Sequence, residues 1–589
     1  MKSWRTRGLL LAGAALFAAL PAFSQESPES LLPPGFSDPE TLPPPVENTS
    51  RPPAPTPTEL PSVEQSNTLA DEELDPLDMP RPSNYFSIPE GRTRSTDVIG
   101  ILTPGNHGLA ENAFGSANGG WLASLMRQLD APLPSRWTSI LLRRALLSRL
   151  AAPGGIAEVD WVAERADLLL RMGEADAARM LVQSVDQENY SSRMIEVAGR
   201  TALATADPAA LCPIVGPARE RSGDAVWIMS EAMCAALEGE AARAAQLLDE
   251  ARRVGAGGID LMLAEKVVGS GPEARRAANV VWDGVGALDA WRFGLAVATG
   301  TEIPAPLMAR AGPAIRAWRA RAPMLPLDQR LEASGFAASL GVFSSRSLVD
   351  VHSLILDMTD PSELTGTPGA LLRTAWSARA TGDRLEAMRS LWRDDEAQGG
   401  RYARLILTAG AATRIVPSAD QQADAGPLIA SMLAAGFDRQ AARWSGIADA
   451  AGGEGWALLA LGTPRPAVDT SAGRVEDYLA ADDSNGRRRG QLMVAGLIGL
   501  GRVSENEASS LAGAAGIDLR RSDSWCEAID QAARMRQPGT VALLAAVGMQ
   551  SGDWGGVPPH YLFRMVRALR SAGMDYEARM IASEAVSRL

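Results

Sequence analysis

The sequence predicts an all-α fold, an α-solenoid of degenerate tetratricopeptide-like helical hairpins preceded by a disordered Pro-rich segment. Apolar residues recur at helical spacing from about Thr96 to Leu589, and a glycine-centred turn recurs along the same stretch. This region of almost 500 residues exceeds the roughly 250–300 residues at which a single core stops growing. Strand signals are thin, because β-branched residues never alternate over a long run. Such a helical region must split into domains or stack as a solenoid.

Residues 1–24 have the pattern of a secretory signal peptide. Three basic residues precede an apolar run of about 13 residues, Gly8 to Leu20, and Ala22 and Ser24 then supply the small-x-small cleavage pattern. A membrane-spanning helix needs about 20 apolar residues. We therefore expect cleavage after Ser24 and a periplasmic or secreted protein, with a retained anchor as the alternative. No later stretch is long enough to span a membrane.

Residues 25–95 differ in composition from the rest. Proline runs such as Pro43-Pro44-Pro45 fix extended backbone, large apolar residues are few, and 13 acidic residues face four arginines, a net charge of −9. Such a segment cannot bury enough apolar surface to offset the entropy of ordering it, so we expect disorder. It would serve as a spacer or a docking tail, or as a solvated leader without a partner.

Residues 96–589 form the predicted helical-repeat region, and residues 159–185 illustrate one hairpin. Two apolar stripes at helical spacing flank Gly173: Val162, Ala166, Leu169 and Leu170 before it, and Ala178, Leu181, Val182 and Val185 after it. Arg171 before the turn and Asp176 after it suit the dipoles of the two helices. The pattern is typical of two antiparallel helices joined at a glycine.

The same corner recurs at five glycines. They are Gly173, Gly239, Gly382, Gly436 and Gly573. An alanine stands five residues after each: Ala178, Ala244, Ala387, Ala441 and Ala578. An apolar residue stands four before each: Leu169, Ala235, Ala378, Met432 and Leu569. Glycine permits a left-handed turn at the end of a helix, and the small alanine lets two helices approach closely.

Proline-rich stretches predict internal junctions near residues 301–327 and 462–473. The last hairpin, from about His560 to Leu589, is a candidate cap for the repeats.

The net charge of −13 becomes −16 once the signal and its three positive charges are removed. A chain this acidic, without a basic stripe, argues against nucleic acid as a partner. No CxxC motif or Cys/His cluster is present, and His107, His352 and His560 are scattered, so we expect no cofactor and no metal site. Three cysteines in an oxidising compartment would allow one disulfide and leave one thiol.

Two stretches carry a family resemblance. Leu102-Thr103-Pro104 with Trp121 and the helix WTSILLRRALLSRL, together with Cys212…Trp227…Cys234 followed by Gly239, resembles a family of exported bacterial helical-repeat proteins. Some members carry an "antifreeze glycopeptide" label, but the Ala-Ala-Thr tandem repeats behind that label are absent here. The likeness covers about 150 residues and implies no activity.

The resemblance favours one cysteine pairing, Cys212 with Cys234. Cys212 precedes Pro213 at an expected helix end, and Cys234 lies on the next helix, so antiparallel packing would bring them within bridging distance. The alternative is two buried free thiols. Cys526, beside Trp525, is expected to be a buried spectator rather than a nucleophile.

Motifs for catalysis are absent from the sequence: it has no GxSxG, HExxH, P-loop or Rossmann glycine pattern. The order Glu505, Glu507, Ser509 and Gly513 faintly resembles the catalytic region of peptidoglycan lytic transglycosylases, but the Leu-Met-Gln of that motif is missing. Glu507 is therefore interpreted as a solvated acid on a helix, and the spread tryptophans as core residues.

The sequence thus favours a non-enzymatic scaffold that binds a protein, peptide or cell-wall partner in the periplasm, since curved repeat surfaces serve extended partners. A peptidoglycan glycosidase and a structural envelope component are the alternatives.

Overall fold

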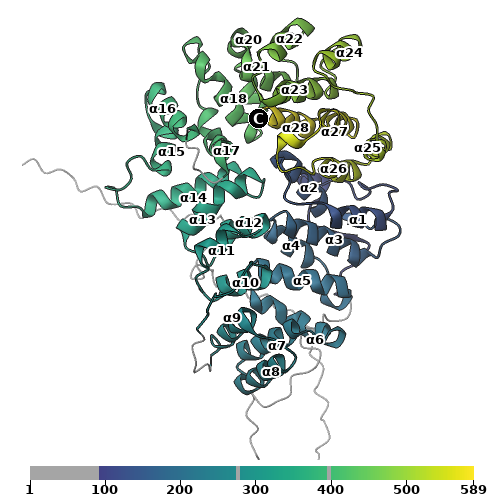
Figure 1. Cartoon of the computed structure of the whole chain (residues 1–589), viewed down its shortest axis with the longest axis vertical. Helices are drawn as coiled ribbons and strands as arrows, with labels where there is room; N and C mark the ends of the chain where they lie inside the picture. The colour runs from purple at the N-terminus through teal and green to yellow at the C-terminus, as the bar shows by residue number, and fades with distance from the viewer. Residues whose placement is uncertain (1–91, 273–278, 394–398) are drawn as a thin grey trace, which may run out of the picture. The chain divides into compact units, whose positions relative to one another are not determined.

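A computed structural model describes residues 92–272, 279–393 and 399–589. These residues form 28 α-helices and one antiparallel pair of two-residue strands, β1 (Val98–Ile99) and β2 (Leu150–Ala151). The all-α solenoid predicted from the sequence is confirmed (Figure 1). The expected signal peptide, and residues 25–91 of the Pro-rich segment, lie outside the described residues.

The helices follow one another with short connections. The first group is α1 (Gly119–Gln128), α2 (Arg136–Leu147), α3 (Glu158–Arg171), α4 (Ala175–Val182), α5 (Ser192–Ala204), α6 (Cys212–Arg221), α7 (Ala225–Leu237), α8 (Ala241–Arg253) and α9 (Gly258–Val268). The second is α10 (Ala290–Ala298), α11 (Ala305–Ala309), α12 (Pro313–Arg321), α13 (Leu327–Ser339), α14 (Ser345–Met358), α15 (Pro368–Ser377), α16 (Thr381–Trp392) and α17 (Gly400–Ala412). The third is α18 (Ala425–Ala434), α19 (Asp438–Ala442), α20 (Ser445–Ala451), α21 (Gly453–Gly462), α22 (Ala472–Ala481), α23 (Arg488–Gly499), α24 (Glu505–Ala514), α25 (Ser524–Arg534), α26 (Pro538–Val547), α27 (Pro559–Ser571) and α28 (Asp575–Ser587).

Four of the five predicted corner glycines end a helix in the same way. Gly173, Gly239, Gly436 and Gly573 have φ of 88°, 85°, 83° and 85°. At each corner the residue after the glycine donates its N–H to the carbonyl of the apolar residue four positions before the glycine: Leu169, Ala235, Met432 or Leu569. This is a Schellman motif. The alanines five residues later are all completely buried at the start of the second helix.

The predicted corner at Gly382 is wrong. Helix α15 ends at Ser377, and Ala378 leaves it in extended backbone, with ψ of 141°. The chain therefore turns before Gly382, which is the exposed second residue of α16. Ala387 is still buried, because it lies on the inner face of α16. Two further corners have the Schellman pattern without glycine, at Ala206 and Arg536, both with positive φ.

Buried apolar residues form two clusters in the described part. One is built mainly from residues 99–322 and the other mainly from residues 317–586. Three helices give buried residues to both: α2, α12 and α26. In α12, Ile315 and Trp318 belong to the first cluster, whereas Ala317 and Ala320 belong to the second. Helix α12 is therefore a shared wall.

The predicted junction near residues 301–327 coincides with this change of cluster. Its prolines begin helices: Pro304 precedes α11, Pro313 is the first residue of α12, and Pro326 precedes α13. Proline suits these positions because its missing N–H would have no partner there. The stretch 462–473 instead joins α21 to α22 inside the second cluster, with Val468 buried.

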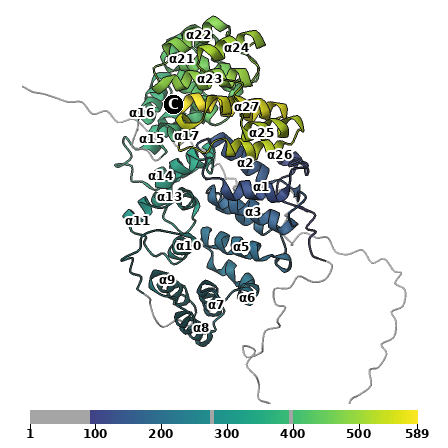
Figure 2. The ribbon, with the colours of Figure 1, turned by 45° about the vertical axis from the view of Figure 1, so that its right-hand side comes forward.

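The predicted cap, the hairpin α27–α28, packs against the beginning of the described chain rather than capping an open end. Helix α28 packs against α2 (Figure 1), and α26 also lies beside α2 (Figure 2). Glu584, 2% exposed, accepts hydrogen bonds from Ser135 Oγ (2.7 Å) and from the backbone N–H groups of Arg136 (2.8 Å) and Trp137 (3.1 Å). A carboxylate at a helix N-terminus satisfies donors that the helix itself leaves unpaired.

Candidate binding cleft

A cleft of about 730 Å³ lies where the two clusters meet. Its walls are the end of α10, the turn after it, α11, α12 and the first half of α13. A glycine corner at Gly300, φ 62°, ends α10, and prolines begin the next helices. The cleft is therefore lined by residues of four consecutive helices and their connections.

The cleft combines apolar and charged side chains. Its apolar wall includes Ile303, Met308, Met324 and Leu325, and Met324 is 62% exposed. Methionine is flexible and polarisable, and it is common on surfaces that adapt to different partners. A volume of this size lies within the roughly 300–1,000 Å³ range of ligand pockets. The mixed lining suits a ligand with both apolar and polar groups.

Two arginines of α12 face the cleft in different states. Arg319 forms an ion pair with Glu332 of α13, at 2.9 Å between Nη2 and Oε2. The Arg316 guanidinium instead stacks over the Phe336 ring, 4.0 Å from the ring centroid. Among the described residues, Arg316 has no carboxylate partner and no hydrogen bond. Its N–H donors are therefore free to bind a ligand in the cleft.

Two other clefts are smaller and are less suited to binding a ligand. One, of about 320 Å³, lies on the other side of α13 and contains His352, whose burial lowers its pKa to about 4. The other, of about 220 Å³, lies between α21 and α22 and contains Trp456, which is only 1% exposed, and Tyr478. A ring buried to that degree presents no free face for a ligand to stack on.

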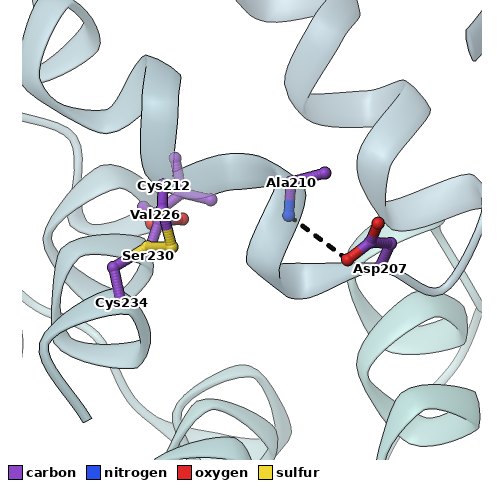
Figure 3. Close-up of a disulfide and its surroundings, with 6 residues drawn as sticks. All are labelled: Asp207, Ala210, Cys212, Val226, Ser230 and Cys234. Carbon is purple, nitrogen blue, oxygen red and sulfur yellow. Dashed lines mark hydrogen bonds between the residues drawn. A yellow bond between two sulfur atoms is a disulfide. The ribbon is translucent and has the colours of Figure 1, made fainter. Parts of the chain in front are cut away.

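The structure joins Cys212 to Cys234 in a disulfide with a Cα–Cα distance of 5.5 Å (Figure 3). Cys212 is the first residue of α6 and Cys234 lies in the last turn of α7, so the bond links the start of one helix to the end of the next. Cys212 is also the C-cap residue of the 3-10 helix Pro208–Leu211, so it lies at a helix end as well as at the start of α6. The bond lies far along the chain from the cleft residues and lines none of the clefts described above.

The remaining candidate residues have structural roles. Glu507 is the third residue of α24 and forms a capping box with Ser504, whose hydroxyl lowers the pKa of the carboxyl. A general acid requires the opposite shift. Cys526 is a free thiol with 0% exposure, and burial raises its pKa, which disfavours the nucleophilic thiolate.

Among the described residues, none of the three histidines or the large core tryptophans forms a site with its neighbours. His107 is an exposed turn residue with φ of 73°, whereas His352 and His560 are buried in different helices. Trp161, Trp444, Trp456 and Trp554 are each 1% exposed and fill the core, whereas Trp121 is 41% exposed. Within residues 92–272, 279–393 and 399–589, no group of His, Cys, Asp and Glu is arranged to hold a metal ion. In the same ranges, no helix has the length and apolar character needed to span a membrane.

The cleft residues were missed in the sequence because they form no motif. Arg316 and Phe336 are 20 positions apart, on helices that differ in length and direction. The prolines of residues 301–327 were the one visible signal, and they indicated a junction rather than a site. Searches of protein-family models, curated proteins and solved structures each found no match to this chain. The geometry of the cleft is therefore the basis on which a function can be proposed.

Proposed function

We propose that the protein is an exported, non-enzymatic helical-repeat scaffold that binds a protein or peptide partner in the cleft between α10 and α13. The single observation that carries this proposal is the cleft itself, which combines an exposed methionine with an unpaired arginine at the junction of the two clusters. A ligand that pairs with this arginine and covers the exposed methionine would gain from both contacts.

Export is supported by the leader-like first 24 residues and by the Cys212–Cys234 bond, because disulfides persist in oxidising compartments. The intact mass of the protein purified from the envelope fraction should correspond to cleavage after Ser24. Alkylation without reductant should label one thiol, Cys526, once the protein is unfolded. An uncleaved mass would favour a membrane anchor, and three labelled thiols would exclude the disulfide.

Binding in the cleft is tested by photo-crosslinking in cells that produce the full chain. A benzophenone amino acid replaces Met324, and in a control it replaces Met535, which is 48% exposed but outside the cleft. We expect adducts of defined mass from position 324 and none from position 535. Equal adducts from both positions, or none from position 324, would contradict the proposal.

The glycosidase alternative has no structural observation in its favour. We expect no clearing when the purified protein is incubated with cell walls in a gel. Clearing that is lost on Glu507→Gln would replace the scaffold proposal with an enzymatic one.

A further inference from the structure

We propose that the cleft beside α12 binds an extended peptide in which a carboxylate lies close to a large apolar side chain, and that Arg316 receives the carboxylate. This inference depends on the proposed function, since it names the chemistry of the ligand for the same cleft.

Arg316 has N–H donors that are available to a ligand. The Arg316 guanidinium lies over the Phe336 ring, with Cζ 4.0 Å from the ring centroid, and this contact uses none of its N–H groups. A planar guanidinium matches a carboxylate with two parallel hydrogen bonds. Most other arginines near the cleft already have partners: Arg319 pairs with Glu332, and Arg321 pairs with Asp176. Arg316 is therefore the cation that is oriented, lines the cleft and has donors to spare.

The apolar wall of the cleft would contact an apolar side chain of the ligand. Met308 is half-buried and Met324 is 62% exposed, and both line the same cleft as Arg316. An exposed methionine in a concave site gains by burial against an apolar side chain. A ligand that satisfied only the arginine would leave this wall in water. The carboxylate and the apolar group must therefore belong to one ligand.

The charge of the cleft distinguishes a carboxylate from a polyanion. Glu302 and Glu332 line the cleft together with Arg316 and Arg319, so its formal charges balance. The whole chain carries −13. The cleft therefore has no surplus of positive charge to hold a phosphodiester chain or a polyphosphate, whereas a single carboxylate beside an apolar group needs only the one unpaired arginine. An acidic and apolar peptide segment fits these constraints.

The test uses the full chain and fluorescence anisotropy. The probe is a labelled peptide that carries one Gly-Asp-Leu unit in a neutral Gly-Ser chain, and the control probe replaces the Asp with Asn. We expect the acidic probe to bind and the Asn probe to bind at least tenfold more weakly. Arg316→Gln should weaken binding of the acidic probe roughly tenfold or more, the effect of losing a charged hydrogen-bond pair. Arg316→Lys, which keeps the charge but loses the planar fork, should fall between the two.

A matched control is Arg310→Gln, because Arg310 is exposed just before α12 but does not line the cleft. It removes the same charge and should leave the affinity within twofold of the original. Met324→Ser should weaken both probes, since it removes the apolar wall. Circular dichroism of each variant establishes that it remains folded.

Three results would overturn the inference: no binding of the acidic probe, equal binding of the Asn probe, or an unchanged affinity in Arg316→Gln. If position 324 still crosslinks a partner in those cases, the proposed function stands and only the ligand chemistry is wrong. If crosslinking at position 324 is also absent, both proposals fail.

Discussion

The contact between α2 and α28 and the cleft beside α12 both bring arginine to a boundary between the two clusters, but they use it differently. In the first, Arg136 is 4% exposed and donates to the carbonyls of Ala338 and Phe343, while Glu584 accepts from several donors of the α2 N-terminus. In the second, Arg316 is half-buried, stacked on a ring and unpaired among the described residues. The buried Arg136 uses its Nη1 on two backbone carbonyls, although its Nε has no partner, whereas the half-buried Arg316 has donors that a ligand can reach.

Removing the charge of Glu584 should have the largest effect. Glu584→Gln leaves one acceptor oxygen and introduces an amide N–H facing donors, so buried groups lose their partners. We expect a loss of about 3–5 kcal/mol in the free energy of unfolding, measured in denaturant. Glu196→Gln is the control, because Glu196 pairs with Arg193 at 55% side-chain exposure. It should cost under about 1 kcal/mol. A similarly small cost for Glu584→Gln would show that the hydrogen bonds of Glu584 contribute little to the stability of the α2–α28 contact.

The corner glycines provide the second test. Gly436 and Gly239 share the Schellman turn and nearly the same φ, 83° and 85°. A methyl group at position 239 would meet nothing within 4 Å, whereas one at position 436 would collide with Tyr576 Oη and the Trp137 ring, beside the α2–α28 contact. Gly239→Ala should cost about 1–2 kcal/mol for the left-handed backbone.

Gly436→Ala should cost a further 1–3 kcal/mol or so, because a well-packed site must shift to accept the methyl group. Thermal unfolding of the two variants measures the difference. If the two variants lost the same stability, the side chains of Tyr576 and Trp137 would be able to move aside for the methyl group at little cost.

The pH dependence of stability tests the side of α13 that faces away from the cleft. Burial, followed by repulsion from Arg404, lowers the pKa of His352 from 6.5 to about 4. Between these values the unfolded chain binds a proton that the folded chain does not, so stability is lost as the pH falls through this window. From pH 6.5 to 5 we expect a loss of about 1.5 kcal/mol from this residue.

The variant His352→Gln should remove this part of the pH dependence while leaving other titrating groups unchanged. Chemical unfolding at both pH values measures it. An identical pH profile in the variant would show that His352 titrates normally in the folded protein.

Arg316→Gln should have the smallest effect on stability. It removes a cation–π contact with Phe336, which contributes about 0.5–1 kcal/mol at a partly exposed site. Thermal unfolding should therefore change little, although binding of the acidic probe should fall sharply. If Arg316→Gln lowered the free energy of unfolding as much as Glu584→Gln, Arg316 would be a residue that stabilises the fold. The two regions would then use arginine in the same way.

Local signals predicted four of the helical corners, but five further glycine corners with the same backbone hydrogen bond were not predicted: Gly255, Gly300, Gly341, Gly501 and Gly516. Glycine with an apolar residue four positions before it gave the C′ residue and the carbonyl acceptor of four Schellman motifs, because that motif is formed within six consecutive residues. Gly382 failed because α15 ends early, which the glycine pattern does not register. The corners at Ala206 and Arg536 were missed because their left-handed residues are not glycine.

Contacts between distant segments were beyond the sequence. Glu584 and Ser135 are 449 residues apart, and nothing in either segment specifies the other. The cleft was hidden for the same reason: Arg316, Phe336 and Met308 come together only once three short helices have packed. The disulfide was accessible through a resemblance, but the position of Cys212 at the start of α6 was not.

The shared position of α12 has a consequence for selectivity. Because its alternate faces belong to both clusters, this helix cannot swing outward without opening two tightly packed interiors at once. Its arginines are consequently presented on a stiff wall, and adaptation is left to the methionines opposite. A ligand must therefore place its carboxylate at a fixed position, whereas its apolar group can vary in shape. The cleft would select ligands by the distance between these two groups more than by the size of the apolar group.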